Sequence, residues 1–390
     1  MKTYLILLIS LTTLLSFGQV QSYYVTPVQT DAAYAIDQDS STISINTGTQ
    51  QNKLYLFIGG TGSSSSSDYN AVRLHAADLG FHFINLSYPN DVAAASLAGD
   101  TDALAFDHYR QEICFGTPLS DDVIVDTLNS VYTRTLKLVQ YLNATHTSEN
   151  WGQFLASPSA LDWSKIIVGG HSQGSGHAAY LAKQFDVDRV LMFSGPNDYS
   201  DFFSGPANWI TQPGTTSLFR HFSYLSLNDE IVDYAKQHAN NAGLGMHIND
   251  DSTYVDNLAS PYTNSHCLYT TQAPGIIILN HNVTVKLSTI NNDVWTYMLT
   301  DPNVTDLENN SLDATLQVYP NPVANQLTIS GKYSQSDLHD LHFYTLQGHQ
   351  IALTTSPKLH QGQITVDISS FEPGMYIIEL NGQALRILKQ

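Results

Sequence analysis

Short apolar runs alternate with longer amphipathic segments from Lys53 to Leu299. The apolar runs predict strands, and the segments with apolar residues at helical spacing predict helices. We expect strands at residues 53–60, 81–90, 165–170, 189–198, 219–229 and 275–282, and helices at 68–80, 125–143, 174–185 and 291–300. This alternation favours an α/β fold, with a mostly parallel sheet and helices on both faces. Ligands bind such sheets at the carboxyl ends of the strands.

The composition changes near residue 301, which predicts a second domain. Residues 302–314 are polar and predict a linker, and residues 315–390 contain short alternating strands separated by Gly, Pro, Asn and Ser. This spacing predicts a small all-β sandwich domain, and it contains no cluster of catalytic residue types. The α/β catalytic domain is therefore expected over residues 19–301.

The first residues have the pattern of a secretory signal peptide. A lysine at position 2 precedes an apolar run from Tyr4 to Leu15, and the small residues Ser16 and Gly18 follow. We expect cleavage after Gly18, giving a signal peptide over residues 1–18. The apolar run is too short for a comfortable transmembrane span, and the absence of a following cysteine argues against a lipid anchor. The protein is expected to be secreted or to lie on the outer cell surface.

Charge and cysteine content exclude several classes of partner. The net charge is −19, which disfavours nucleic acid and anionic membrane surfaces. Cys114 and Cys267 are the two cysteines, and they are expected to form either a disulfide or two buried free thiols. Without a Cys-x-x-Cys pair or clustered His and Cys residues, we expect no metal site.

The segment Gly170-His171-Ser172-Gln173-Gly174 lies between an expected strand and an expected helix. A serine in a G-x-S-x-G turn of this kind is exposed as a nucleophile, and the glycines leave room where the chain reverses. A serine hydroxyl needs a neighbouring base to attack a carbonyl group. We therefore expect Ser172 to be the nucleophile of an acyl-transfer reaction.

An acyl-transfer site also needs two fixed N–H donors for the oxyanion. One is expected from the backbone of Gln173, the residue after the nucleophile. The other is expected from Thr61, in the glycine-rich loop at the end of strand 53–60, and Gly60 is the alternative donor. Gly60 is also expected to contact the substrate. This loop lacks the Gly-Lys-[Ser/Thr] ending of a phosphate-binding loop.

The acid and base must follow the serine in the order Ser, Asp, His. Asp229 stands at the end of the expected strand 219–229, and we favour it over Asp198, which ends the preceding strand. His281 and His266 both lie downstream of Asp229. We favour His281 because it follows an apolar run, and His266 remains the rival base.

For each of four other residues near the site, two roles remain as alternatives. His171 and His177 flank the serine and are expected to pack or to bind solvent near the turn. Tyr88, near the end of the expected strand 81–90, and Trp209, between two strands, either line the substrate pocket or pack in the core.

Residues 50–300 resemble the α/β-hydrolase superfamily, and more narrowly a poorly characterised secreted bacterial branch of serine esterases. The resemblance depends on "GGTG", "GFHFINLSYPN", "RQEICFG", "GHSQGSGHAAYLA", "FSGPND", "SHCLYTT" and "VWTYML". Many relatives have Gly where Ser175 stands. The resemblance implies the α/β-hydrolase fold and acyl-transfer hydrolysis by a Ser-His-Asp triad. It does not determine the substrate, because one fold supports many activities.

Residues 315–390 resemble the C-terminal sorting domain of type IX secretion in Bacteroidetes. The segments "YPNP", "YTLQGHQI", "VDISSFEPGMYIIEL" and the terminal "RILKQ" carry this resemblance. It implies export through the type IX secretion machinery, and usually removal of the tail. An Ig-like carbohydrate-binding module is the alternative.

Together these features predict a secreted serine hydrolase that cleaves carboxylic esters and needs neither a metal nor an organic cofactor. An extracellular substrate is expected: an acylated polysaccharide, a lipid or a polyester. A serine peptidase or amidase is one alternative, and a non-catalytic protein that binds a glycan or a partner is another.

Overall fold

The computed structural model of the 390-residue chain describes residues 19–246, 252–273, 279–301, 317–330, 333–335, 337–345, 349–360, 363–380 and 383–390. The chain divides into two compact units, residues 1–303 and 304–390. The expected signal peptide, the expected linker and residues 275–278 of the expected strand 275–282 lie outside the described residues. Within the described residues, no helix is both long enough and apolar enough to cross a membrane.

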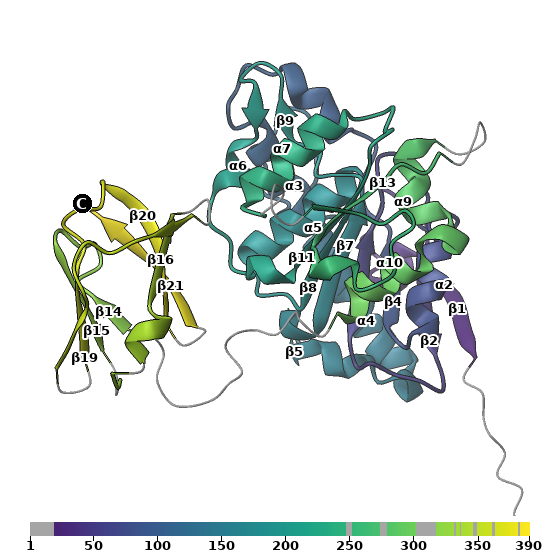
Figure 1. Cartoon of the computed structure of the whole chain (residues 1–390). Coiled ribbons are helices and arrows are strands. Elements are labelled where there is room, and N and C mark those ends of the chain that lie inside the picture. Colours follow the sequence, from purple (N-terminus) through teal and green to yellow (C-terminus); the bar gives the residue numbers. More distant parts are fainter. Residues whose placement is uncertain are drawn as a thin grey trace, which may run out of the picture. The chain divides into compact units, whose positions relative to one another are not determined.

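A nine-stranded sheet forms the centre of the first unit (Figure 1). In spatial order its strands are β1 (Val20–Val25), β2 (Ser41–Asn46), β4 (His82–Leu86), β3 (Leu54–Ile58), β7 (Ile166–His171), β8 (Arg189–Phe193), β11 (His221–Ser226), β13 (Cys267–Thr270) and β12 (Ser252–Tyr254). The strands β1, β2 and β4 pair antiparallel, and every pairing from β4 to β12 is parallel. The prediction of a mostly parallel sheet is therefore confirmed.

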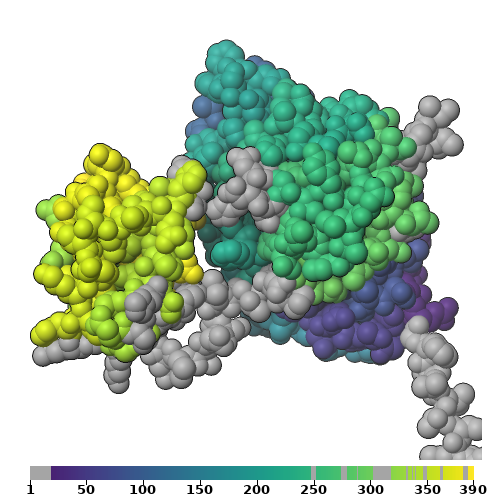
Figure 2. Space-filling view, in the orientation of Figure 1, coloured from purple at the N-terminus to yellow at the C-terminus, as the bar shows by residue number. Residues whose placement is uncertain are grey.

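Helices pack on both faces of this sheet. Their bounds are α1 Pro27–Thr30, α2 Asn70–Asp78, α3 Ala105–Phe115, α4 Val131–Thr145, α5 Gln173–Gln184, α6 Asn208–Thr211, α7 Tyr234–Leu244, α9 Val283–Lys286 and α10 Ser288–Thr300. The alternation of side chains along β3 shows the two faces: Leu56 and Ile58 join the core with α4 and α5, and Phe57 packs against Tyr69, next to α2. α2 and α10 lie side by side, as Figure 1 shows. Figure 2 shows the purple N-terminal strands at the surface of one side of this unit.

Helix α4 begins at Val131, six residues later than the sequence predicts. The side chain of Asp126 accepts the N–H of Asn129 at 2.8 Å, which forms a turn in place of the first helical residues. Ser130 then caps the helix by accepting the N–H of Thr133 at 3.2 Å. Local side-chain hydrogen bonds therefore set the start of this helix.

Residues 280–282, which the sequence assigns to the end of a strand, form a short 3₁₀ helix. The carboxylate of Glu230 accepts the N–H of Asn280 at 2.8 Å and that of His281 at 3.1 Å. Because these N–H groups bind a side chain, they are not available for a strand ladder. The assignment of residues 280–282 to a strand is therefore wrong.

Cys114 and Cys267 are both buried and are not joined in a disulfide, so the disulfide alternative does not hold in this structure. The sulfur of Cys114 lies 3.6 Å from Nδ1 of His177, inside the core.

The second unit contains two antiparallel four-stranded sheets. One has the order β14 (Gln317–Tyr319), β15 (Gln326–Ser330), β19 (Gln363–Asp367) and β18 (Lys358–His360); the other has β17 (Gln350–Ile351), β16 (His342–Thr345), β20 (Gly374–Leu380) and β21 (Gln383–Lys389). Apolar residues from both sheets, such as Ile329 and Ile378, form a single core. The prediction of a short-stranded β unit after residue 315 agrees with these sheets.

Three buried histidines should make the first unit sensitive to acid. Burial lowers the pKa of His171 to about 3 and that of His221 to about 4, and it holds the pKa of His177 well below its usual value. In the unfolded chain a histidine has a pKa of about 6.5. Below that pH the unfolded chain binds protons that the folded chain does not, so stability is complete above pH ~6.5 and falls as the pH falls.

We expect urea unfolding to show this loss between pH 6.5 and 5, by up to about 1.4 kcal/mol per pH unit for each histidine. The variant His221→Phe removes one of the three groups, so its stability should fall less steeply with pH than that of the native protein. A native stability that does not change over this range would contradict the prediction.

Candidate active site

Ser172 lies at a sharp turn between β7 and α5, with φ 57° and ψ −123°. A positive φ is uncommon for a residue with a side chain, and such strain is concentrated at functional sites. The chain passes so closely here that a Cβ on Gly170 would lie 2.3 Å from the backbone of Gly174. A Cβ on Gly174 would lie 2.0 Å from the carbonyl oxygen of Ile58. The two glycines of the G-x-S-x-G pattern are therefore required by the turn.

A cavity of about 360 Å³ opens over this turn at the carboxyl ends of the strands. The cavity brings together residues that are distant in the sequence. It is lined by Gly60, Thr61, Gly62, Ser63, Asp68, Tyr69, Ala93, Ala94, Ala95, His171, Ser172, Gln173, Asn197, Ile231, Val232, His281, Asn282 and Lys286. The predicted nucleophile, the favoured base and both predicted oxyanion residues are among them.

His281 is paired with Asp229. Nδ1 of His281 lies 2.6 Å from Oδ2 of Asp229, whose side chain is fully buried. Because a carboxylate only accepts hydrogen bonds, Nδ1 carries the proton and Nε2 is left as the acceptor. An imidazole in this tautomer can take a proton at Nε2.

Asp229 is held in its charged form. Its Oδ1 accepts the N–H groups of Ile231 and Val232, each at 2.9 Å, and its Oδ2 accepts the side chain of Gln237 at 2.8 Å. Burial by itself would raise the pKa of this carboxyl, but the hydrogen bonds from His281, Val232 and Gln237 outweigh it and lower the pKa. Asp229 therefore remains a carboxylate at neutral pH.

The rival acid, Asp198, is occupied elsewhere. Arg110 binds both of its oxygens, with Nε lying 2.8 Å from Oδ2, and both side chains are fully buried. The indole N–H of Trp209 donates to the same Oδ2 at 2.8 Å. Asp198 therefore belongs to a buried ion pair beneath the site.

The rival base, His266, lies at the opposite end of the parallel strands from Ser172. It directly precedes β13, which runs parallel to β11, so it lies at the amino ends of these strands. Its ring stacks on Phe222 at 4.2 Å, and its Nε2 lies 4.0 Å from Asp301. The structure thus places His281, and not His266, in the cavity that Ser172 lines.

The loop after β3, which we call the oxyanion loop, contains Gly60 and Thr61. Of the backbone N–H groups of these two residues, one has no hydrogen-bond partner in the part of the chain that the structure describes. The N–H of Gly60 donates to the hydroxyl of Tyr69 at 2.8 Å and is therefore occupied. Within the described residues, the backbone N–H groups of Thr61 and Gln173 have no hydrogen-bond partner. The side chain of Gln173 accepts the hydroxyl of Thr61 at 2.8 Å, which joins the loop to the start of α5. The geometry favours Thr61 over Gly60 as the second donor.

Tyr88 and Trp209 lie behind the site. The hydroxyl of Tyr88 donates to the carbonyl of Gly59 at 2.7 Å and accepts the side-chain amide of Gln173 at 3.3 Å. Trp209 is buried against Tyr180 and Asp198. Neither residue lines the cavity of Ser172, so packing describes them better than lining of the substrate pocket, although Tyr88 lines the neighbouring pocket described below.

Several lining residues were not predicted from the sequence. Asn197 donates from Nδ2 to Oγ of Ser172 at 3.2 Å and is 4% exposed. Its position near the end of the expected strand 189–198 could have indicated it. The small residues Ala93, Ala94 and Ala95 and the ion pair of Lys286 with Asp68, at 3.0 Å, belong to segments without any motif.

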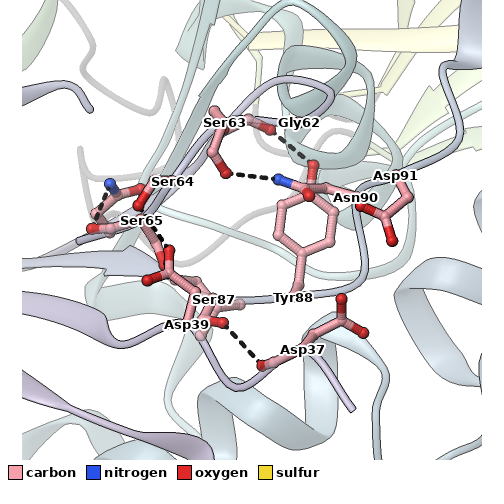
Figure 3. Close-up of a pocket in the computed structure, with 13 residues that line it drawn as sticks. Asp37, Asp39, Gly62, Ser63, Ser64, Ser65, Ser87, Tyr88, Asn90 and Asp91 are labelled. Atoms are coloured by element: carbon pink, nitrogen blue, oxygen red, sulfur yellow. Dashed lines mark hydrogen bonds between the residues drawn. The ribbon is translucent and has the colours of Figure 1, made fainter. Parts of the chain in front are cut away.

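A second pocket of about 270 Å³ lies on the other side of the oxyanion loop and shares Gly62 and Ser63 with the first (Figure 3). Asp39 accepts hydrogen bonds from the hydroxyls of Ser64 and Ser65, at 2.9 and 3.0 Å. These hydrogen bonds anchor Ser64 and Ser65 of the loop to Asp39. Among the residues that the structure describes, no group of three or more His, Cys, Asp or Glu side chains is arranged to hold a metal ion.

Comparison with known families identifies the second unit. Residues 317–390 match the family described as the secretion system C-terminal sorting domain. No curated protein matches the chain. The protein therefore carries a type IX sorting tail, which interacts with the type IX secretion machinery and directs the protein to the cell surface or the extracellular space. The match does not extend to the unit that contains Ser172.

Proposed function

We propose that the first unit is a serine hydrolase with the α/β-hydrolase fold, which cleaves carboxylic esters outside the cell through an acyl-enzyme on Ser172. One observation carries the proposal: Ser172, on a strained turn, shares a cavity with His281, and His281 is bonded to the buried Asp229 at 2.6 Å. A nucleophile, a base and a group that orients the base are the parts that this chemistry needs.

In the first half of the reaction, Oγ of Ser172 attacks the acyl carbon of the ester. Nε2 of His281 takes the hydroxyl proton, and Asp229 stabilises the resulting imidazolium. The N–H groups of Gln173 and Thr61 donate to the oxyanion, assisted by the positive end of the dipole of α5. When the intermediate collapses, the imidazolium returns the proton to the leaving alcohol, and the acyl group stays on Ser172.

In the second half, a water molecule loses a proton to Nε2 of His281 and attacks the acyl carbon. The same N–H groups stabilise the second oxyanion. The bond between the acyl carbon and Oγ then breaks, Oγ regains a proton from the imidazolium, and a carboxylic acid is released. This scheme uses no metal or organic cofactor.

The cavity and the tail bear on the substrate. The charged side chains that line the cavity are those of Asp68 and Lys286, which pair with each other. The lining is therefore close to neutral, in a protein of net charge −19. This favours uncharged esters over anionic ones. Because the tail exports the protein, esters of extracellular polysaccharides, lipids or polyesters are the proposed substrates.

The variant Ser172→Ala tests the proposal. We expect the native protein to hydrolyse p-nitrophenyl acetate or butyrate, and Ser172→Ala to lose at least about 10³-fold in kcat, because no nucleophile remains. Ser157→Ala, at an exposed serine of β5 (Leu155–Ser157), is the matched control and should keep native activity. Equal rates for native protein and Ser172→Ala would disprove the proposal. Peptide substrates assayed in parallel identify a peptidase.

A further inference from the structure

A chain of hydrogen bonds connects the oxyanion loop to the residue proposed as the base. The N–H of Gly60 donates to the hydroxyl oxygen of Tyr69 at 2.8 Å. The hydroxyl of Tyr69 lies 3.2 Å from Nδ1 of His171, and Nε2 of His171 lies 3.0 Å from the carbonyl oxygen of His281. The side chains of Tyr69, His171 and His281 are all buried. The chain therefore runs through the interior, next to the cavity.

The two ends of this chain set its direction. A backbone N–H only donates and a carbonyl oxygen only accepts, so Nε2 of His171 must carry a proton. Nδ1 of a neutral imidazole is then an acceptor, so the Tyr69 hydroxyl donates its hydrogen bond to Nδ1 of His171. When His171 is neutral and Tyr69 keeps its proton, each hydrogen bond between Gly60 and His281 therefore has only one possible direction.

The surroundings favour those two states. Burial is the main cause that lowers the pKa of His171 to about 3, and burial raises the pKa of Tyr69 to about 12. The ring of Tyr69 packs on Phe57 at 4.8 Å and lies 5.6 Å from that of His171. Neither group titrates near neutral pH, so neither acts as an acid or base in the proposed reaction.

The chain bears on both halves of the proposed machinery. At one end it occupies the N–H of Gly60, which holds the loop so that the N–H of Thr61 is left for the oxyanion. At the other end it fixes the carbonyl of His281, which also accepts the hydroxyl of Ser194 at 2.7 Å. A displacement of about 1 Å in such a site costs about 10²-fold in rate.

We propose that Tyr69 and His171 are positioning residues that couple the oxyanion loop to His281, so that the loop and the base are held as one unit. This inference rests on the proposed function. It assigns His171, the neighbour of the nucleophile, a role other than that of the base. Loss of either side chain should lower kcat in the same way, because the interrupted hydrogen-bond chain no longer holds the oxyanion loop and His281 in fixed positions.

A double-mutant cycle on the full chain tests this coupling. Tyr69→Phe removes only the hydroxyl, and His171→Phe removes both ring nitrogens. We expect each to lower kcat for p-nitrophenyl acetate by about 10-fold or more and to change KM less than about twofold, because the oxyanion donors act in the transition state. The double variant should lose no more than the worse single variant, whereas independent effects multiply.

The control is Tyr234→Phe. The hydroxyl of Tyr234 also lies 3.2 Å from Nδ1 of a histidine, His238, but this pair belongs to α7 and does not line the cavity of Ser172. It should leave kcat and KM unchanged. Multiplicative losses in the double variant, or a native kcat in Tyr69→Phe, would overturn the coupling.

A second readout separates the coupling from the proposed function. If the native protein hydrolyses no ester, the proposed function fails, and ¹⁵N spectra of labelled histidines still decide the coupling. Among the signals of the neutral histidines, the set that is lost in His171→Phe belongs to His171. We expect these signals to show a proton on Nε2 and no titration between pH 8 and 5. The signals of His281 should shift in Tyr69→Phe and stay in place in Tyr234→Phe. Unshifted His281 signals in Tyr69→Phe would refute the coupling.

Discussion

The variant Asp229→Asn should lower kcat for p-nitrophenyl butyrate by about 10⁴-fold and leave the fold intact. Asparagine has the shape of aspartate, and its Oδ1 can still accept the N–H groups of Ile231 and Val232. Its amide, however, can donate to Nδ1 of His281 and so favour the tautomer with the proton on Nε2. That tautomer cannot take the proton of Ser172, and no carboxylate remains to stabilise the imidazolium.

The same chemical change at Asp198 is the matched control. Asp198→Asn alters the carboxylate that binds Arg110 and Trp209, so it should lower stability but not the rate per folded molecule by more than about tenfold. The two variants thus separate the acid that we propose from the one that the sequence left as an alternative. More than a tenth of native kcat in Asp229→Asn would contradict the assignment.

The variant Arg110→Met should destabilise the first unit by about 3–5 kcal/mol. Arg110 and Asp198 are both fully buried, so removing the cation leaves an unpaired charge in the core. Arg110 also donates to the carbonyl of Gln173 at 2.8 Å, at the start of α5. The fold makes room for it at Gly176, where a Cβ would lie 2.1 Å from Nη2 of Arg110.

Urea unfolding at pH 7.5 measures this loss. The double variant Arg110→Met/Asp198→Asn removes both charges, so it should recover much of the stability that the single variant loses. A loss below about 1 kcal/mol in Arg110→Met would show that the pair does not stabilise the core in the way that its burial indicates.

Much of the fold could be predicted because local patterns determine it. The apolar runs at 53–60 and 165–170 became β3 and β7, and the segment after Ser172 became α5. The turn at Ser172 was predictable for the same reason, since its two glycines are required by contacts within a few residues and with β3. The sorting tail was recognisable from its motifs, and the family comparison confirms it.

The sequence favours His281 as the base because it follows the apolar run of the segment 275–282, which is expected to be a strand. In the structure, other contacts hold His281 in place. The carboxylate of Glu230, about fifty residues away, holds the backbone of His281, and Asp229 binds its ring. Adjacent residues of one loop thus fix both parts of the histidine. The sequence places this loop correctly after β11, but it does not show that the loop reaches residue 281.

The remaining parts of the site depend on long-range contacts that no local pattern records. The pairing of Arg110 with Asp198 joins segments 88 residues apart, and the bond of Tyr69 to His171 spans 102 residues. Asn197 belongs to an expected strand, and only the folded chain brings its amide to Oγ of Ser172. Such contacts form only when the sheet brings segments that are distant in the sequence next to each other.

The most direct measurement of the central claim is the site of covalent labelling by a serine-directed phosphonate. The native protein is treated with the phosphonate, digested, and examined by peptide mass spectrometry, with Ser172→Ala treated in parallel. We expect one adduct, on Ser172, which is absent in Ser172→Ala. A native protein that acquires no adduct, or acquires it on another residue, would contradict the assignment of Ser172 as the nucleophile.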